Sequence, residues 1–283
     1  MRFSFLISLT FILLPTYLIA QNPGPFAHPL QIEPVSIYNK LRVDGSYFDK
    51  RTNVIYEQNR NISIEGEYNF WNHFSISSSL GRNQYTLTDT EPSNTYDRFN
   101  LGLKYGRIID FGSSSLLLGG GIRLYDKKKG TDTTDRENPD FYLVRPNFGI
   151  GFRSGRFEIL SEFRFQTETN RSFREGNLDE FRRYYQFGLA PSFAINQTFR
   201  TFMEFEYREP YDRMVDTKTR FFNFYPGVSF ATENLGTFSI SLQIGLLKRE
   251  ENAIDRGIRF SYFYFFDMDN LSSKKNESPT NIN

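Results

Sequence analysis

Hydrophobic and polar residues alternate along most of this chain, and the alternation is almost unbroken from Arg60 to Phe70. A period of two residues predicts a β-strand, because successive side chains of a strand point to opposite faces. The apolar face holds Ile62, Ile64, Gly66, Tyr68 and Phe70, and the polar face holds Asn61, Ser63, Glu65, Glu67 and Asn69. A soluble sheet packs its apolar face in a core, whereas a membrane barrel turns that face toward lipid and keeps the polar face inside.

The same alternation recurs about twelve times and predicts an all-β fold. Helical periodicity is absent after the N-terminal stretch. The predicted strands are longer than the ~5–6 residues usual in soluble sheets and long enough for the ~9–11 residues of a tilted membrane strand. They lie near 36–48, 60–70, 74–85, 97–108, 115–125, 141–153, 157–167, 182–195, 199–209, 219–231, 237–247 and 257–267.

Short and long connections alternate between these strands. The short turns lie near 71–73, 109–114, 153–156, 196–198 and 232–236. The longer polar loops lie near 49–59, 86–96, 126–140, 168–181, 210–218 and 248–256. Short turns at one end and long loops at the other are typical of an up-and-down transmembrane β-barrel with an even number of strands.

Aromatic residues gather at both ends of the predicted strands, as in the girdles of membrane barrels. Those beside the short turns are Phe70, Trp71, Phe74, Phe152, Phe157, Phe193, Phe199, Phe230, Phe238 and Phe266, and those beside the long loops are Tyr47, Tyr85, Tyr125, Tyr142, Tyr185 and Tyr207. Charge is missing from the middle of the apolar faces, where Lys or Arg would cost ~2–4 kcal/mol at the bilayer midplane. A secreted β-sandwich with an aromatic core remains the alternative, since alternation alone fits both folds.

The first twenty residues read as a secretory signal peptide. Arg2 precedes a largely apolar run from Phe3 to Ile19, and we expect cleavage near Ala20. A retained membrane anchor is the alternative for this segment. The chain has no Cys, which excludes a disulfide framework, a thiolate metal site and the cysteine of a lipid anchor. The net charge of +1 gives no reason to expect a nucleic-acid partner.

In pattern, girdles, loop lengths and signal, residues 36–267 resemble the outer-membrane β-barrel proteins of diderm bacteria. The resemblance is architectural and rests on no family-specific motif. It implies 1–20 as signal peptide, 21–35 as an N-terminal periplasmic segment, 36–267 as the barrel and 268–283 as a polar disordered tail. It also implies outer-membrane lipid and the barrel-assembly machinery as partners. The chain departs from many such barrels because its last strand ends at Phe266 and a polar tail follows.

Strand parity assigns a set of charged side chains to the lumen, where charge selects the solutes that pass. Lys40, Arg42, Asp44, Glu65, Glu67, Arg200 and Arg259 belong to this set. The candidate solute-steering residues are Arg98, Lys104, Arg123, Arg145, Arg164, Arg182, Arg208, Glu158, Glu162, Glu204 and Glu206. The fourth to sixth predicted strands carry only basic lumen charges, so we expect a basic wall that favours anions.

Three functions remain open at this point. The first is a porin-like channel for small solutes, anions among them. The second is a non-conducting barrel, plugged by Arg and Glu pairs, whose long loops bind partners. The third is a lipid-modifying barrel enzyme, for which no catalytic set is evident.

Motifs with a chemical reading are few. His73 and Ser75 form a triplet faintly similar to an outer-membrane phospholipase pattern, but parity turns both toward the lumen and away from lipid. We therefore expect no enzyme and no cofactor. Pro146, Pro191 and Pro226 recur on outward positions of three strands, and since Pro cannot donate to a ladder we expect a local bulge at each.

Overall fold

The computed structural model describes residue 26 and residues 38–51, 56–87, 92–96, 99–125, 143–168, 184–210, 220–232, 236–247 and 256–265. The predicted signal peptide, the loop at 126–140 and the tail at 268–283 lie outside these ranges. Among the described residues, no helix is long and apolar enough to cross a membrane.

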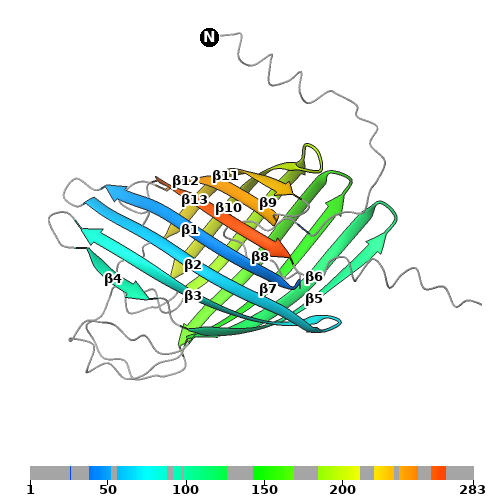
Figure 1. The fold of residues 1–283 in the computed structure, drawn as a ribbon, viewed down its shortest axis with the longest axis horizontal. Helices are drawn as coiled ribbons and strands as arrows, with labels where there is room; N and C mark the ends of the chain where they lie inside the picture. Colours follow the sequence, from blue (N-terminus) through cyan, green and yellow to red (C-terminus); the bar gives the residue numbers. More distant parts are fainter. Residues whose placement is uncertain are drawn as a thin grey trace, which may run out of the picture.

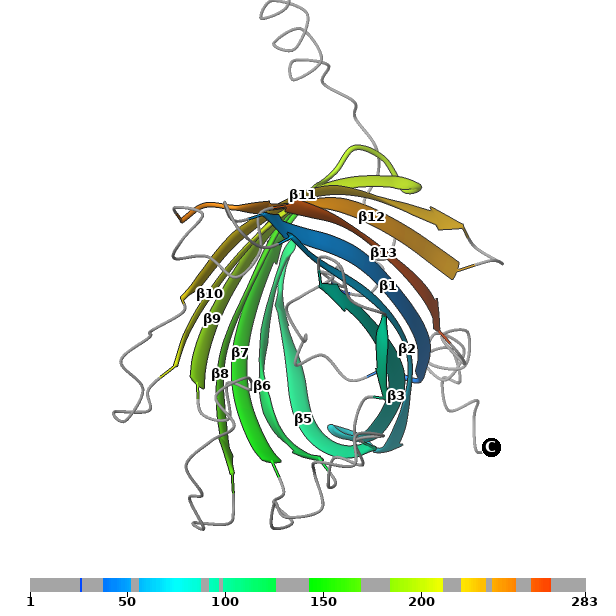
Figure 2. The same cartoon turned by 90° about the vertical axis from the view of Figure 1, so that its left-hand side faces the viewer.

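The chain folds into antiparallel strands that form one closed barrel (Figures 1 and 2). The strands are β1 (Lys40–Arg51), β2 (Tyr56–Trp71), β3 (Phe74–Leu87), β4 (Ser93–Tyr96), β5 (Asn100–Phe111), β6 (Ser114–Tyr125), β7 (Leu143–Ser154), β8 (Phe157–Glu168), β9 (Tyr184–Ala194), β10 (Phe199–Pro210), β11 (Phe221–Thr232), β12 (Gly236–Gly245) and β13 (Arg256–Phe265). Apart from β4, each strand pairs with the next strand of the wall, β3 pairs with β5, and β13 pairs with β1 to close the wall. The predicted all-β, up-and-down fold is confirmed.

The closed wall has 12 strands, and β4 is an addition to it. The segment 86–96 was expected to be a loop, but β4 lies within it and pairs only with the end of β3. The reason is that β3 extends to Leu87, past Ser79, which pairs with the first residue of β5. The protruding part of β3 therefore has an open edge, and β4 supplies hydrogen-bond partners for it.

Three of the short turns depend on glycine in the left-handed backbone region. Gly112 and Gly155 have φ angles of 66° and 56° in the turns after β5 and β7, and Gly236 has a φ angle of 84° at the start of β12. A side chain at these angles clashes with the backbone, so glycine is the residue that allows these tight reversals.

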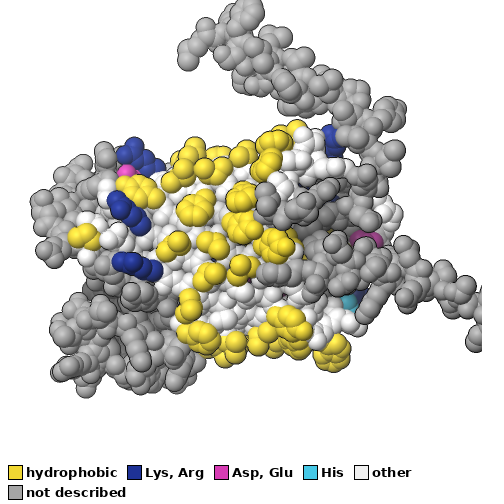
Figure 3. Space-filling model, in the orientation of Figure 1, with side chains coloured by type: hydrophobic (Ala, Val, Ile, Leu, Met, Phe, Trp, Pro, Cys, Tyr) yellow, Lys and Arg dark blue, Asp and Glu magenta, His cyan; other side chains and the backbone are white. Residues whose placement is uncertain are grey.

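The apolar face of each strand points outward. Between Arg60 and Phe70, Ile62 and Tyr68 expose 54% and 63% of their surface, whereas Glu67 on the opposite face exposes 5%. Figure 3 shows hydrophobic side chains, in yellow, across the middle of the wall, and Lys and Arg side chains gathered mostly toward one end. A wall that exposes so many large apolar side chains requires an apolar solvent, and a closed barrel leaves no strand edge unpaired within it.

The aromatic girdle beside the short turns is largely confirmed. Its exposed members in the described chain are Phe70, Trp71, Phe152, Phe157, Phe193, Phe199, Phe230 and Phe238. Tyr125 is a correction to the girdle expected beside the long loops. It shares the lumen-facing parity of Arg123, and the guanidinium of Arg145 lies 4.5 Å from its ring centroid. Tyr142 and Phe266 lie outside the described residues.

The prediction of a bulge at each outward proline is wrong. The β9–β10 ladder omits two consecutive pairs beside Pro191 and then resumes in the same register. The same gap occurs beside Pro226 in the β11–β12 ladder and beside Pro146 in the β7–β8 ladder. Each proline keeps its pairing with the other neighbouring strand, so the missing donor is absorbed without a register shift.

Candidate solute path in the barrel lumen

The lumen-facing side chains are mostly polar and mostly buried. Of the residues predicted to steer solutes, Lys104, Arg123, Arg164, Glu158, Glu162, Glu204 and Glu206 are buried, and Arg145 and Arg208 are half-buried. Arg98 and Arg182 lie outside the described residues. Because a buried charge is costly without a partner, the pairing of these groups decides what the lumen can do.

Two carboxylates of β2 anchor an ion-pair network, which we call the β2 network. Glu67 lies 2.9 Å from Nζ of Lys40 and 2.8 Å from Nζ of Lys104. Glu65 lies 3.5 Å from Nζ of Lys40 and 2.9 Å from a guanidinium nitrogen of Arg123. The two acids thus hold three cations that come from β1, β5 and β6.

The β2 network neutralises part of the basic wall that the sequence predicted. Lys104 and Arg123 belong to that wall, and each is paired with a carboxylate of β2. Arg123 on β6 reaches Glu65 past β3 and β5, which separate their strands (Figure 2). Contacts of this kind fill the interior of a narrow barrel and narrow any path through it.

A second charged group lies near the short-turn ends of β7, β8 and β10. Arg153 and Arg200 lie 2.6 Å and 3.4 Å from the same carboxylate oxygen of Glu158. Arg200 also donates a hydrogen bond to Ser192 at 3.3 Å. The guanidinium of Arg153 lies 4.2 Å from the ring centroid of Phe26. Phe26 belongs to the segment expected to be periplasmic, and no pattern in the sequence indicated its place against the lumen wall.

A third group lies at the long-loop ends of β7 to β11 and on β13, and we call it the Arg–Tyr cluster. It consists of Arg145, Arg164, Arg208, Arg259, Tyr184, Tyr225, Glu162, Glu204 and Glu206. Its four guanidinium groups outnumber its three carboxylates. Parity predicted its charged members, but not the tyrosines between them.

Arg145 is held by neutral groups. It donates two hydrogen bonds to the side-chain oxygen of Gln166, at 3.0 and 2.6 Å. Its guanidinium also lies 4.5 Å from the ring centroid of Tyr125 and 5.9 Å from that of Tyr184. Within the described part of the chain, no carboxylate lies within ion-pair distance of Arg145.

The other arginines of the Arg–Tyr cluster have mixed partners. Arg164 pairs with Glu162 at 2.9 Å and Arg208 pairs with Glu206 at 2.8 Å, each on the same strand. These are the same-strand ion pairs that small barrels use to fill their interior.

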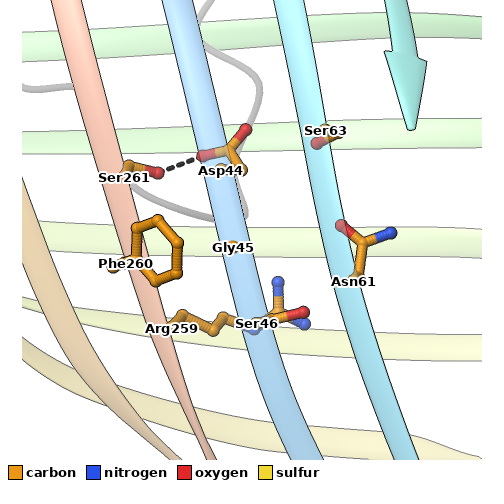
Figure 4. Close-up of a pocket in the computed structure, with 8 residues that line it drawn as sticks. All are labelled: Asp44, Gly45, Ser46, Asn61, Ser63, Arg259, Phe260 and Ser261. Atoms are coloured by element: carbon orange, nitrogen blue, oxygen red, sulfur yellow. Dashed lines mark hydrogen bonds between the residues drawn. The ribbon is translucent and has the colours of Figure 1, made fainter. Parts of the chain in front are cut away.

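Arg259 resembles Arg145 in having a neutral partner, since it donates to Gln243 at 3.0 Å and lies 5.2 Å from the ring centroid of Tyr225. A small polar cavity of about 130 Å³ adjoins it. Figure 4 shows the cavity between β13, β1 and β2, lined by Asp44, Gly45, Ser46, Asn61, Ser63, Arg259, Phe260 and Ser261. This volume holds a few water molecules at most.

His73 and Ser75 do not form a catalytic pair. The hydroxyl of Ser75 is fully buried and donates to Glu67 at 2.7 Å. His73 lies in the β2–β3 turn with its ring 5.9 Å from that of Tyr105. The hydroxyl serves the β2 network, and the imidazole contacts an outward-facing ring.

No family model and no curated protein matches this chain. Among solved structures, it is similar to the COG4313 outer membrane channel from Pseudomonas putida F1, with a TM-score of 0.60 and 9% identity over 84% of this chain and 100% of that chain. It is also similar to the NanC porin, with a TM-score of 0.49 and 13% identity over 80% and 98% of the two chains, and to LpxR from Salmonella typhimurium, with a TM-score of 0.44 and 10% identity over 80% and 100%. The chain thus has the fold of the bacterial outer-membrane β-barrel proteins.

Proposed function

We propose that this outer-membrane barrel is a narrow pore for small anionic solutes and that the Arg–Tyr cluster selects them. The observation that carries the proposal is that the Arg–Tyr cluster holds four guanidinium groups and three carboxylates, and that the partners of Arg145 among the described residues are neutral. The similarity to an outer membrane channel from Pseudomonas putida F1 agrees with this function.

The chemistry of the cluster favours anions over cations. A guanidinium group offers a planar fork of donors that matches carboxylate and phosphate oxygens. In a lumen of low effective dielectric constant, an uncompensated positive charge attracts anions more strongly than it does in water. The rings of Tyr125 and Tyr184 lie against the guanidinium groups of Arg145 and Arg208 and help to hold them in place without adding negative charge.

The same proposal includes the route to the membrane. Residues 1–20 direct export and are removed near Ala20, and the barrel-assembly machinery inserts the mature chain into outer-membrane lipid. The proposal assigns no lipid-modifying reaction to the His73–Ser75 triplet, since the hydroxyl of Ser75 is engaged inside the wall.

A non-conducting barrel is the second candidate, because the Arg123–Glu65 pair and the ring of Phe26 both fill lumen space. Planar-bilayer recording of the refolded mature chain, residues 21–283, decides between the two. We expect discrete conductance steps and a reversal potential in a salt gradient that reports anion preference. An insertion that never conducts would instead support the plugged barrel, whose long loops then become the functional part.

Arg145→Gln is the variant that tests the selecting role. Its partners among the described residues are neutral, so the substitution leaves none of the described acids unpaired and the fold should tolerate it. We expect a clear loss of anion preference at nearly unchanged heat-modifiability of the barrel. Arg60→Gln is the matched control, because Arg60 is exposed on the outer face beside Tyr47. An equal effect of the two substitutions would contradict the assignment of selectivity to the cluster.

A further inference from the structure

The ring of Phe26 occupies a defined apolar site inside a polar lumen. Phe26 exposes 1% of its surface and packs with Leu117, Leu160 and Ala190, which expose 0%, 3% and 2%. These three residues share the lumen-facing parity of their strands β6, β8 and β9. The ring therefore does not belong to a strand of the wall. It comes from the segment before β1 and packs against the inner surface of the wall.

The wall is shaped to make this site. Gly151 on β7 lies between the two leucines, and a Cβ atom there would lie 2.5 Å from Cδ2 of Leu160 and 3.2 Å from Cβ of Leu117. The absence of a side chain at Gly151 lets the leucines of β6 and β8 meet across β7. One continuous apolar surface results, large enough for a phenyl ring.

The polar side of the site carries an excess of positive charge. Arg153 lies over the ring of Phe26 at 4.2 Å from its centroid and shares Glu158 with Arg200. An anion that enters beside Arg153 therefore meets two guanidinium groups that share one carboxylate.

The hydroxyl of Tyr38 lies close to the position that a substituent on the ring would occupy. The backbone N–H of Phe26, two bonds beyond Cβ, donates to the hydroxyl of Tyr38 at 3.3 Å. Tyr38 lies before β1 and so outside the strands. Burial raises the pKa of Tyr38 to about 12, so its hydroxyl keeps its proton at physiological pH.

We propose that this site binds aryl carboxylates in which one or two carbon atoms separate the ring from the carboxylate, and that such ligands displace Phe26. The inference rests on the proposed function, since it names a solute class for the same lumen. The aryl group takes the place of the Phe26 ring between Arg153 and the leucines. The carboxylate then reaches the hydroxyl of Tyr38 and the cations around Glu158. A simple anion lacks the apolar contact, and a neutral aromatic molecule lacks the ionic one.

Calorimetric titration of the full mature chain in detergent tests the proposal with three probes: phenylacetate, acetate and benzyl alcohol. In the wild type, Phe26 competes with the ligand, so we expect Phe26→Ala to bind phenylacetate about tenfold more tightly or better. Acetate and benzyl alcohol should bind at least about tenfold more weakly than phenylacetate to the same variant. Phe238→Ala is the matched control, since its ring is exposed on the outer face. It should bind phenylacetate as the wild type does.

Three results would overturn the proposal: no gain on Phe26→Ala, equal binding of acetate and phenylacetate, or equal binding of benzyl alcohol and phenylacetate. The double variant Phe26→Ala with Arg153→Gln should lose the preference for phenylacetate over benzyl alcohol. If Phe26→Ala fails to fold, Phe26→Ser in the same titration answers the same question.

Binding in detergent does not depend on conduction. Phenylacetate binding without any conductance would therefore refute the pore and keep the site, whereas anion conductance without phenylacetate binding would do the reverse.

Discussion

Glu67 illustrates how a lumen residue acquires its role from its partners. Its side chain is fully buried, forms an ion pair with Lys40, and accepts hydrogen bonds from Lys104 and from the hydroxyl of Ser75. Removing one member of a buried ion pair costs far more than the net contribution of the pair, because the remaining charge keeps its desolvation penalty. The β2 network is thus a structural requirement of the barrel as much as a feature of the lumen.

Glu67→Gln should therefore destabilise the folded barrel by about 3–5 kcal/mol. The substitution preserves size, but it turns one of the two acceptor oxygens into a donor amide and leaves two buried ammonium groups with less counter-charge. The measurement is the temperature at which heat-modifiability is lost in electrophoresis of the refolded chain. Glu57→Gln, near the long-loop end of the same strand, is the control and should shift this temperature little. Equal shifts would show that the β2 network does not hold the wall.

The sequence could predict which side chains face the lumen, but not which of them meet. Parity placed Glu65 and Arg123 correctly, since a period of two needs only local information. Their contact depends on the positions of β2 and β6 in the closed barrel, which are separated by two strands. The same limit explains Phe26: nothing local to residue 26 indicates that it lies against Leu117 and Leu160.

At the scale of the strands, some glycines leave room for a side chain of the neighbouring strand. Gly227 on β11 is paired with Phe202 on β10, and a Cβ atom at Gly227 would lie 2.3 Å from Cζ of Phe202 and 2.7 Å from the carbonyl oxygen of Ile240. The lumen-facing ring of Phe202 thus covers the gap that the glycine leaves, as an aromatic residue often does for a glycine in a sheet.

Gly227→Ala should destabilise the barrel by about 1–3 kcal/mol, because the new methyl group has to displace both a ring and a backbone carbonyl. Gly66→Ala is the matched control. Gly66 lies on the outer face of β2, and a Cβ atom there meets nothing within 4 Å. Folding yields into phospholipid vesicles, compared for the two variants at equal lipid composition, provide the measurement. A normal yield for Gly227→Ala would show that Phe202 moves aside freely.

Strand ranges were predictable to within a few residues because alternation persists over each strand. The prolines show where this kind of prediction fails. Pro191 and Pro226 each suggested a bulge, but the barrel instead leaves two ladder pairs unformed on one side of the strand and keeps the register. Whether a sheet absorbs a missing donor by a bulge or by a gap depends on the register of both neighbours, which lies outside the local sequence.

The barrel as a whole depends on the contrast between its two faces. Along β12, Leu242 exposes 54% of its surface to the outside, and Gln243 exposes 1% and faces the lumen. One residue of shift would exchange the two faces of a strand. The register of the hydrogen-bonded wall therefore fixes which residues form the outward apolar belt. The fold class could be predicted from the sequence because this arrangement requires apolar and polar residues to alternate along every strand.

A charge placed in the belt should have an effect that depends on depth. Leu242 lies at the centre of the outward row of β12, and Leu246 lies beyond its long-loop end, with 44% of its surface exposed. Leu242→Arg should cost about 2–4 kcal/mol of folding free energy in a bilayer, and Leu246→Arg about 0–1 kcal/mol, because an arginine near the interface reaches water. The fluorescence of Trp71, the chain's single tryptophan, reports insertion from the short-turn rim during denaturant titration in vesicles. Equal costs for the two variants would mean that the outward row of β12 does not cross the hydrocarbon region. Its exposed apolar side chains would then be explained by contact with another protein instead of with lipid.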